Sequence, residues 1–185
     1  MLVTKYKLII IFLFLFTSFA ESEILQKEKL DKLFYRLSKT YDYNNANLLE
    51  KKIWAVWHKH PNNESLTDKL KLGTDSMYEG NFKYALQVFT NIIITDPSWA
   101  EAWNKRATLL FFMNQYQRSL SDIDTVLHLE PRHFGALSGR AQIFIELKEY
   151  EKAIKDLKKI KKIHPTIKGN DTIPKLGKLI KNLSV

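Results

Sequence analysis

Apolar residues recur with helical spacing along most of the chain, and polar residues fill the intervals. From Tyr150 to Ile160 the apolar positions follow i, i+3, i+4 and i+7, which is the pattern of a helix with one buried stripe. Residues 30–37 and 49–57 carry two earlier stripes, separated by a predicted turn over 41–45. A last stripe runs from Leu176 to Leu183 in a helix expected to begin near Ile173. The pattern predicts an all-α protein.

Between residues 66 and 167 the pattern repeats every 34 positions. Pro97, Pro131 and Pro165 mark the period, because proline cannot donate the next helical hydrogen bond and so ends a helix. Six further columns keep the same period: Gly73/Ala107/Ala141, Phe82/Tyr116/Tyr150, Ala85/Ser119/Ala153, Leu86/Leu120/Ile154, Phe89/Ile123/Leu157 and Ile92/Val126/Ile160. Each block therefore predicts two helices joined by a tight turn, at 80–81, 114–115 and 148–149, with small residues where the helices approach closely.

These columns resemble the tetratricopeptide repeat family, whose 34-residue unit has small residues at positions 8 and 20, an aromatic near 17 and a proline at 32. Trp103 also falls where the family commonly has tryptophan, and the stretches 103–107 and 129–137 resemble small exported proteobacterial members. The resemblance implies a right-handed superhelix of antiparallel helix pairs. Such stacks bury a continuous core, and their terminal units are atypical.

The chain divides into four predicted parts. Residues 1–20 form a signal peptide, 21–65 a degenerate N-terminal helical repeat, 66–167 three tetratricopeptide-type repeats, and 168–185 a C-terminal capping helix. The first unit is called degenerate because Pro61 lies 36 residues before Pro97, which points to an insertion at Asn62 and Asn63. The capping helix would cover the open side of the third repeat and leave Lys175, Lys178 and Lys181 facing water.

The predicted signal peptide has a basic head with Lys5 and Lys7, then an apolar run, then small residues at Ser18 and Ala20. The apolar stretch from residue 8 to 20 is shorter than the roughly 20 residues that span a bilayer. We therefore expect cleavage after Ala20 and a periplasmic or secreted protein. The alternative is an uncleaved anchor, and only then would the chain contact a membrane.

Composition narrows the possible chemistry. Cysteine is absent, which excludes disulfides, thiolate metal sites and a cysteine nucleophile. The net charge is +9, and the stretch from Lys148 onward holds 11 lysines against four acidic residues. This basic end either serves anionic partners or reflects a composition rich in lysine, isoleucine and asparagine. A basic amphipathic helix on a membrane surface remains the alternative to the cap.

No motif for catalysis, a metal or a cofactor stands out. His58 and His60 point to opposite sides of a helix, and no His-Glu-x-x-His pattern occurs. The remaining histidines, at positions 128, 133 and 164, lie near block boundaries, where polar turn residues are ordinary. Ser138, His133 and Asp124 could be written as a triad, but their spacing does not support it. We expect a protein that is not an enzyme and that has neither cofactor nor metal.

The resemblance implies that the first helix of each block lines a groove for a protein or peptide, with no nucleic acid expected. The candidate groove residues are Tyr78, Glu101, Asn104, Thr108, Phe111, Phe112, Ser138, Gln142 and Glu146. Asn104 and Gln142 could pair with a peptide backbone, while the aromatic residues could equally be inter-repeat core. Some family members clamp a terminal carboxylate with Lys, Asn and Arg, but the corresponding positions here hold Leu70, Thr74, Gly135 and Gly139.

Two functions follow from these patterns. The first is a non-enzymatic scaffold or adaptor, exported to the cell envelope, that binds a partner in the groove. The alternative is a membrane-tethered structural component of the envelope that uses its lysine-rich end on anionic surfaces.

Overall fold

The computed structural model describes residues 21–167 and 172–183, and within them all regular secondary structure is helical. The predicted signal peptide lies outside the described residues. A helix over residues 21–38 is followed by α2 (Tyr43–Trp57), α3 (Glu64–Tyr78), α4 (Phe82–Thr95), α5 (Ala100–Phe112), α6 (Tyr116–Leu129), α7 (Phe134–Glu146), α8 (Tyr150–Ile163) and α9 (Thr172–Leu183). None of the described helices is long and apolar enough to span a membrane.

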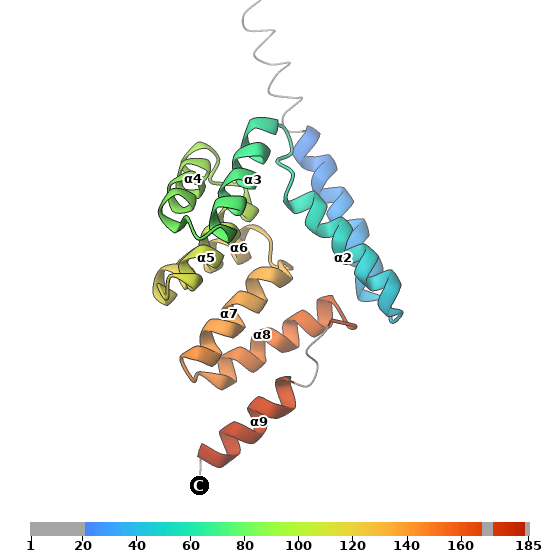
Figure 1. Ribbon diagram of the computed structural model, residues 1–185. Coiled ribbons are helices and arrows are strands. Elements are labelled where there is room, and N and C mark those ends of the chain that lie inside the picture. Colours follow the sequence, from blue (N-terminus) through green and yellow to red (C-terminus); the bar gives the residue numbers. More distant parts are fainter. Residues whose placement is uncertain (1–20, 168–171, 184–185) are drawn as a thin grey trace, which may run out of the picture.

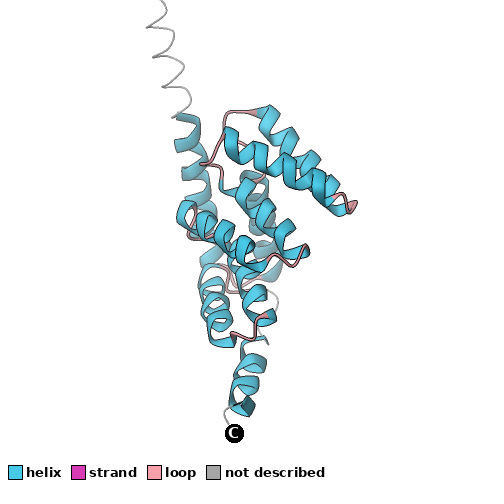
Figure 2. Ribbon diagram, turned by 90° about the vertical axis from the view of Figure 1, so that its left-hand side faces the viewer, coloured by secondary structure: helices cyan, strands magenta, loops and turns pink. Residues whose placement is uncertain are grey.

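The three repeats are the helix pairs α3/α4, α5/α6 and α7/α8, which stack side by side into a solenoid (Figure 1). Each second helix packs against the first helix of the next pair, and α5 also contacts α3 and α7. This confirms the predicted all-α solenoid of antiparallel helix pairs. A side view shows the pairs following one another toward the C-terminal end (Figure 2).

The small columns do sit where helices approach closely. A Cβ added to Gly73 would lie 2.6 Å from Cε1 of Phe89 on the paired helix, too close for any real contact. In the second repeat the hydroxyl of Ser119 donates to the carbonyl of Ala107 at 2.7 Å, and both residues are buried. These close contacts explain why the columns exclude larger side chains.

A second feature with the same period is a buried ion pair inside each of the last two repeats. Arg106 donates to both carboxylate oxygens of Asp122, and Arg140 donates to both oxygens of Asp156, with distances of 2.7–2.9 Å. Arg140 also reaches Asp124 on the preceding helix at 2.8 Å. Such two-point contacts fix the angle between helices as well as their distance.

The turns inside the repeats share one backbone feature. Gly80, Asn114 and Lys148, each 34 residues apart, all have positive φ, at 81°, 57° and 59°. Glycine takes this conformation without strain and asparagine tolerates it, whereas lysine adopts it at some cost. The turn geometry is therefore kept even where the residue is unfavourable.

The helix over 21–38 and α2, which we call the N-terminal pair, do not extend the stack as a further repeat. Their apolar stripes pack with Phe134, Leu137 and Ile160 of the third repeat, and α2 does not stack on α3 as the repeats stack on one another. The pair lies across the loops that join successive repeats (Figure 1). The sequence predicts a degenerate first repeat over residues 21–65. The structure has a helix pair there, but this pair packs on the inter-repeat loops and the third repeat instead of stacking on α3. We call its contact with these loops, at 96–101, 129–134 and 164–167, the seam.

At the other end, α9 lies against α8. Leu176 is buried with Ala141 and Ala153, as expected of a helix that covers the last repeat. Leu179, which the stripe places on the buried face, is 45% exposed. The three lysines of α9 are exposed.

Candidate functional site

The face formed by α5 and α7 carries a groove with a cavity of about 350 Å³. Half of its lining consists of glycine, alanine and serine, which carry little or no side chain, and aromatic and polar residues make up most of the rest. The lining residues are Asn104, Ala107, Thr108, Phe111, Phe112, Ser119, Ile123, Gly135, Ala136, Ser138, Gly139 and Gln142. We call this the α5–α7 groove.

Six of the nine predicted groove residues line this cavity: Asn104, Thr108, Phe111, Phe112, Ser138 and Gln142. Tyr78 is 76% exposed on α3 but does not line it. Glu146 is exposed and accepts a hydrogen bond from Gln142 at 3.0 Å. The structure thus brings together the predicted residues of the second and third repeats and leaves Tyr78 apart.

Glu101 differs from the expectation, because its side chain points into the protein and the residue is only 1% exposed. Its carboxylate accepts from His133 at 3.0 Å and from Asn104 at 3.2 Å, and His58 and Lys105 lie 3.1 Å and 3.5 Å away. The side-chain amide of Asn104 is therefore committed, at least in part, inside the protein. Neither the Glu101 carboxylate nor that amide group is free for a partner.

The groove offers apolar contact together with a few free polar groups. Phe112 is 49% exposed at its rim, and Phe111 behind it packs on Phe112 and Tyr116 with ring centroids 6.0 Å and 5.6 Å apart. Ser138 is exposed, and Gln142 keeps its amide oxygen free. No lysine or arginine lines the cavity. This surface suits an uncharged stretch of polypeptide better than an anion.

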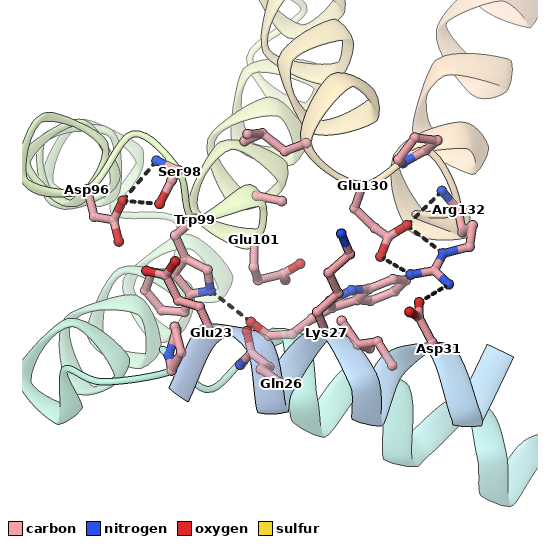
Figure 3. Close-up of a pocket in the computed structure, with 16 residues that line it drawn as sticks. Glu23, Gln26, Lys27, Asp31, Asp96, Ser98, Trp99, Glu101, Glu130 and Arg132 are labelled. Atoms are coloured by element: carbon pink, nitrogen blue, oxygen red, sulfur yellow. Dashed lines mark hydrogen bonds and ion pairs between the residues drawn. The ribbon is translucent and has the colours of Figure 1, made fainter. Parts of the chain in front are cut away.

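A second and larger cavity, of about 570 Å³, lies at the seam (Figure 3). One wall is the helix over 21–38, and the other consists of the loops at 96–101 and 129–132. Trp57 and Trp99 are buried beside it, and the indole N–H of Trp99 donates to the carbonyl of Trp57 at 3.0 Å. The cavity therefore exists only because the N-terminal pair covers the loops.

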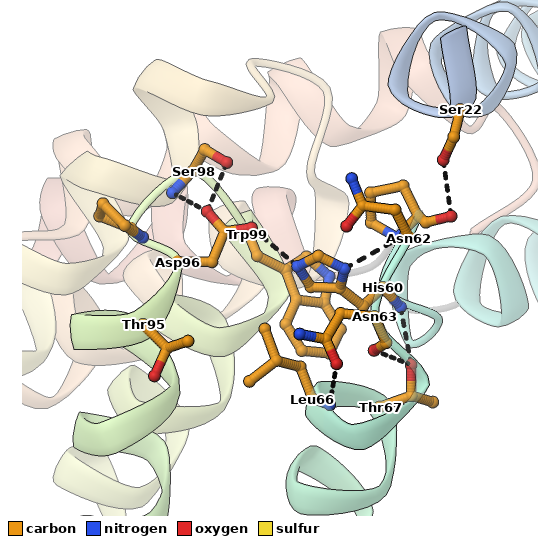
Figure 4. Close-up of polar contacts among 12 residues, drawn as sticks. Ser22, His60, Asn62, Asn63, Leu66, Thr67, Thr95, Asp96, Ser98 and Trp99 are labelled. Carbon is orange, nitrogen blue, oxygen red and sulfur yellow. Dashed lines mark hydrogen bonds and ion pairs between the residues drawn. The ribbon is translucent and has the colours of Figure 1, made fainter. Parts of the chain in front are cut away.

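Four of the five histidines lie at this seam, and each faces a carboxylate. His60 meets Asp96 at 2.7 Å (Figure 4), His164 meets Glu50 at 3.1 Å, and both His133 and His58 meet Glu101. The sequence interpretation of histidines as ordinary turn residues missed these pairs. One signal was available in the sequence: the residues directly before the first four of the five prolines are all titratable, namely His60, Asp96, Glu130 and His164.

The hydrogen bonds fix the protonation of two of these rings. The backbone N–H of Asn62 donates to Nδ1 of His60, and that of Ala136 donates to Nδ1 of His133. An Nδ1 that accepts carries no proton, so Nε2 must be the nitrogen that donates to the carboxylate. In this arrangement His60 and His133 each accept a backbone N–H at Nδ1 and face a carboxylate through Nε2.

The carboxylates remain ionised. The hydrogen bond from His60 outweighs partial burial and lowers the pKa of Asp96 to about 2, with help from Ser98. For Glu101, burial favours the neutral form, but the hydrogen bond from His133 and the nearby ring of His58 prevail and hold its pKa below the usual range. The hydrogen bond from His164 likewise lowers the pKa of Glu50. These pairs stabilise the seam.

The described residues do not assemble the chemistry of a hydrolase. Ser138 is exposed in the α5–α7 groove, whereas His133 is buried against Glu101 and Asp124 binds Arg140. Within the described chain no group of three or more potential metal ligands comes together.

Comparison with known proteins places the chain among repeat proteins. No family model matches it. It is 37% identical over 113 residues to a TPR repeat-containing protein of Rhizobium etli, which covers 61% of this chain; the chain spans about half the length of that relative, 55%.

Solved structures share the fold. The first TPR domain of Spaghetti (RPAP3), bound to an HSP90 peptide, superposes with a TM-score of 0.60 at 18% identity and covers 64% of this chain and 94% of its own. The Arabidopsis OM64 TPR domain gives 0.58 at 18% identity over 62% of this chain and 96% of its own. The TPR2B domain of yeast Sti1, in a complex with pHsp70, gives 0.54 at 17% identity over 66% and 98%.

Proposed function

We propose that this chain is a tetratricopeptide-repeat protein that serves as a non-enzymatic scaffold and binds a protein or peptide partner in the α5–α7 groove. Two structural neighbours are complexes, one with an HSP90 peptide and one with pHsp70, and they support binding as the use of this fold. Fold alone does not decide function, so the proposal depends on the site.

The observation that carries the proposal is the composition of the groove. Its lining combines glycine, alanine and serine with the half-exposed ring of Phe112 and the exposed polar residues Ser138 and Gln142. Aromatic side chains supply much contact area at small entropy cost, and the polar groups can pair with a backbone. With no cation in its lining, the groove favours an apolar or amide-rich segment over an acidic tail.

The test uses two serines on the solenoid helices. We expect Ser138→Arg to fill the groove, while Ser121→Arg places the same side chain on the exposed surface of α6, outside the cavity. Peptides enriched from a random library on the wild-type chain should bind Ser138→Arg at least about tenfold more weakly and Ser121→Arg within about twofold. Equal loss in both variants, or no loss in either, contradicts the groove.

We further propose that the chain is exported, with cleavage after Ala20 and a mature start at Glu21. The three-part character of residues 1–20 supports this. N-terminal sequencing of the chain recovered from the envelope or medium tests it. A protein that keeps Met1 would contradict cleavage and favour the anchored form.

The alternative function, a tethered envelope component, receives one supporting observation. The start of the helix over 21–38 and α9 lie at opposite ends of the described chain (Figures 1 and 2). A chain held at its N-terminal end would thus present α9 and the exposed lysines of α8 to a different surface. Salt would weaken binding at that end far more than binding in the groove, which separates the two functions.

A further inference from the structure

We propose that the seam cavity is a second binding site, which takes a polypeptide segment carrying lysine or arginine beside apolar side chains. This site goes beyond the α5–α7 groove, because it is built by the N-terminal pair and the inter-repeat loops rather than by the first helices of the repeats. Its size of about 570 Å³ falls in the range of ligand pockets.

The cavity has the shape of a short channel. Its lining along the first helix runs from Glu23 to Asp31 (Figure 3), a rise of about 12 Å at about 1.5 Å per residue. An extended chain advances about 3.3 Å per residue, so the channel has room for three to four residues. A peptide segment fits this length.

The walls are held in place before any partner arrives. Gln26 on the first helix donates to the carbonyls of Val56 and Lys59 at 3.1 Å and 2.8 Å, and Trp99 donates to Trp57. At the other end Arg132 joins Glu130 to Asp31 (Figure 3). A preformed site spends little of its binding free energy on ordering.

The floor is apolar, with Leu30, Trp57, Trp99 and Leu129 among the lining residues. Leu129 is partly exposed, so apolar surface is open to a partner. The indole N–H of Trp57 is buried and has no acceptor among the described residues. Apolar side chains of a partner would cover this floor, and its cations would sit near the indole rings, which attract positive charge.

The charge of the lining identifies the partner's sign. Five carboxylates line the cavity, namely Glu23, Asp31, Asp96, Glu101 and Glu130, against the two cations Lys27 and Arg132. The neighbouring rings of His60 and His133 each accept a backbone N–H at Nδ1 and donate to their carboxylates through Nε2. Lys105, which lies beside Glu101, removes one further charge at most. The cavity thus stays negative on a protein whose net charge is +9.

The test uses a capped peptide of alternating leucine and lysine, with an alternating leucine–glutamate peptide as its counterpart. Binding is measured by titration calorimetry on the full chain, with the indole signals of Trp57 and Trp99 as a local readout. We expect the lysine peptide to bind, the glutamate peptide not to bind, and affinity to fall as salt rises.

Two charge reversals on one helix locate the site. Glu23 lines the cavity, whereas Glu28 is exposed on the same helix and does not. Glu23→Lys changes the charge by two units at roughly 6 Å from a bound cation, which in water amounts to about a tenfold loss of affinity. Glu28→Lys should change it less than twofold. Both residues are exposed, so both variants should fold, which circular dichroism checks.

Other outcomes overturn the proposal. Equal losses in Glu23→Lys and Glu28→Lys would mean unspecific attraction to the whole surface. A loss in Ser138→Arg with none in Glu23→Lys would place the peptide in the α5–α7 groove. A concentration-dependent dimer that only Glu23→Lys abolishes would make the occupant a second copy of this chain. Failure of the groove would leave the Glu23→Lys result unaffected, so the two sites are tested separately.

Discussion

The replacement His133→Ala tests the seam most sharply, because His133 joins three parts of the protein. Its ring is fully buried and stacks on Trp57 of the N-terminal pair, with centroids 3.9 Å apart and planes 9° from parallel. Its Nδ1 accepts the N–H of Ala136 and so caps α7, while its Nε2 donates to Glu101. Loss of the ring therefore affects the cap, the stacking and the buried carboxylate together.

The expected cost can be built from these contacts. A lost N-terminal cap costs about 1 kcal/mol, and a lost aromatic pair about 1 kcal/mol. A buried carboxylate that loses its donor costs about 3 kcal/mol, at the lower end of the usual range, because Asn104, His58 and Lys105 still lie near Glu101. We expect His133→Ala to lower the free energy of unfolding by about 4–5 kcal/mol.

The double variant Glu101→Gln/His133→Ala separates the charge from the rest. Removing the charge should recover about 2 kcal/mol relative to His133→Ala, so the double variant is the more stable of the two. Urea unfolding at pH 7, followed by circular dichroism and tryptophan fluorescence, gives both values. A double variant no more stable than His133→Ala would refute the view that Glu101 is a buried charge held by His133.

Three further changes have definite expected outcomes in thermal or urea unfolding. Gly135→Ala should lower the free energy of unfolding by about 1–2 kcal/mol, because the added Cβ would lie 2.5 Å from Cη2 of Trp54. The control Gly139→Ala should be neutral or stabilising, because the nearest atom to its Cβ lies 3.8 Å away. Equal effects of the two changes would contradict the packing of the N-terminal pair on α7. Lys148→Gly should stabilise by about 0.5–1 kcal/mol by relieving a φ of 59°, and a lower melting temperature would speak against it. Asp96→Asn should be less stable than wild type at pH 6. Because the pKa of Asp96 is lowered to about 2, its stabilisation of about 2 kcal/mol is present above pH 4 and is lost as pH falls to 2. The difference in unfolding free energy between the two proteins should therefore close near pH 2, and a difference that stays constant with pH would contradict this.

The repeat architecture could be predicted from sequence because each structural demand recurs at a fixed period. Gly73 is small because Phe89 lies against it, and Ser119 is small because it touches the backbone of Ala107. The same columns pack together again 34 residues later, where Ala107 shares a buried cluster with Ile123 and Ala141 shares one with Ala153. Prolines that end each pair set the frame in which the other columns align.

The place of the N-terminal pair could not be predicted in this way. The stripe of α2, with Leu49, Ile53 and Trp57, shows that one face is buried but not what buries it. A helix stacked as a further repeat and a helix lying across the inter-repeat loops would both bury the same apolar stripe. The deciding residue is Phe134, which packs against both Phe34 and Trp57 although it lies 77 residues further along the chain than Trp57.

The residues of the candidate groove, too, could be predicted only in part. Position within the repeat correctly brings Phe112, Ser138 and Gln142 to one cavity, because helical register determines which face a residue occupies. Glu101 has an equivalent register, but His133 and His58 draw its side chain inward. This inward orientation depends on contacts with residues of other elements, so the pattern within a single repeat does not reveal it.

The most direct test of the central claim is a map of the bound peptide on the protein by NMR. A peptide enriched on the wild-type chain is titrated into labelled protein, and the shifts of backbone amides and side-chain amides are followed. The proposed scaffold function predicts that the largest shifts fall on α5 and α7, at Thr108, Phe112 and the side-chain amide of Gln142. Shifts that gather on the outer faces of α6 and α8 instead, with these three residues unchanged, would contradict it.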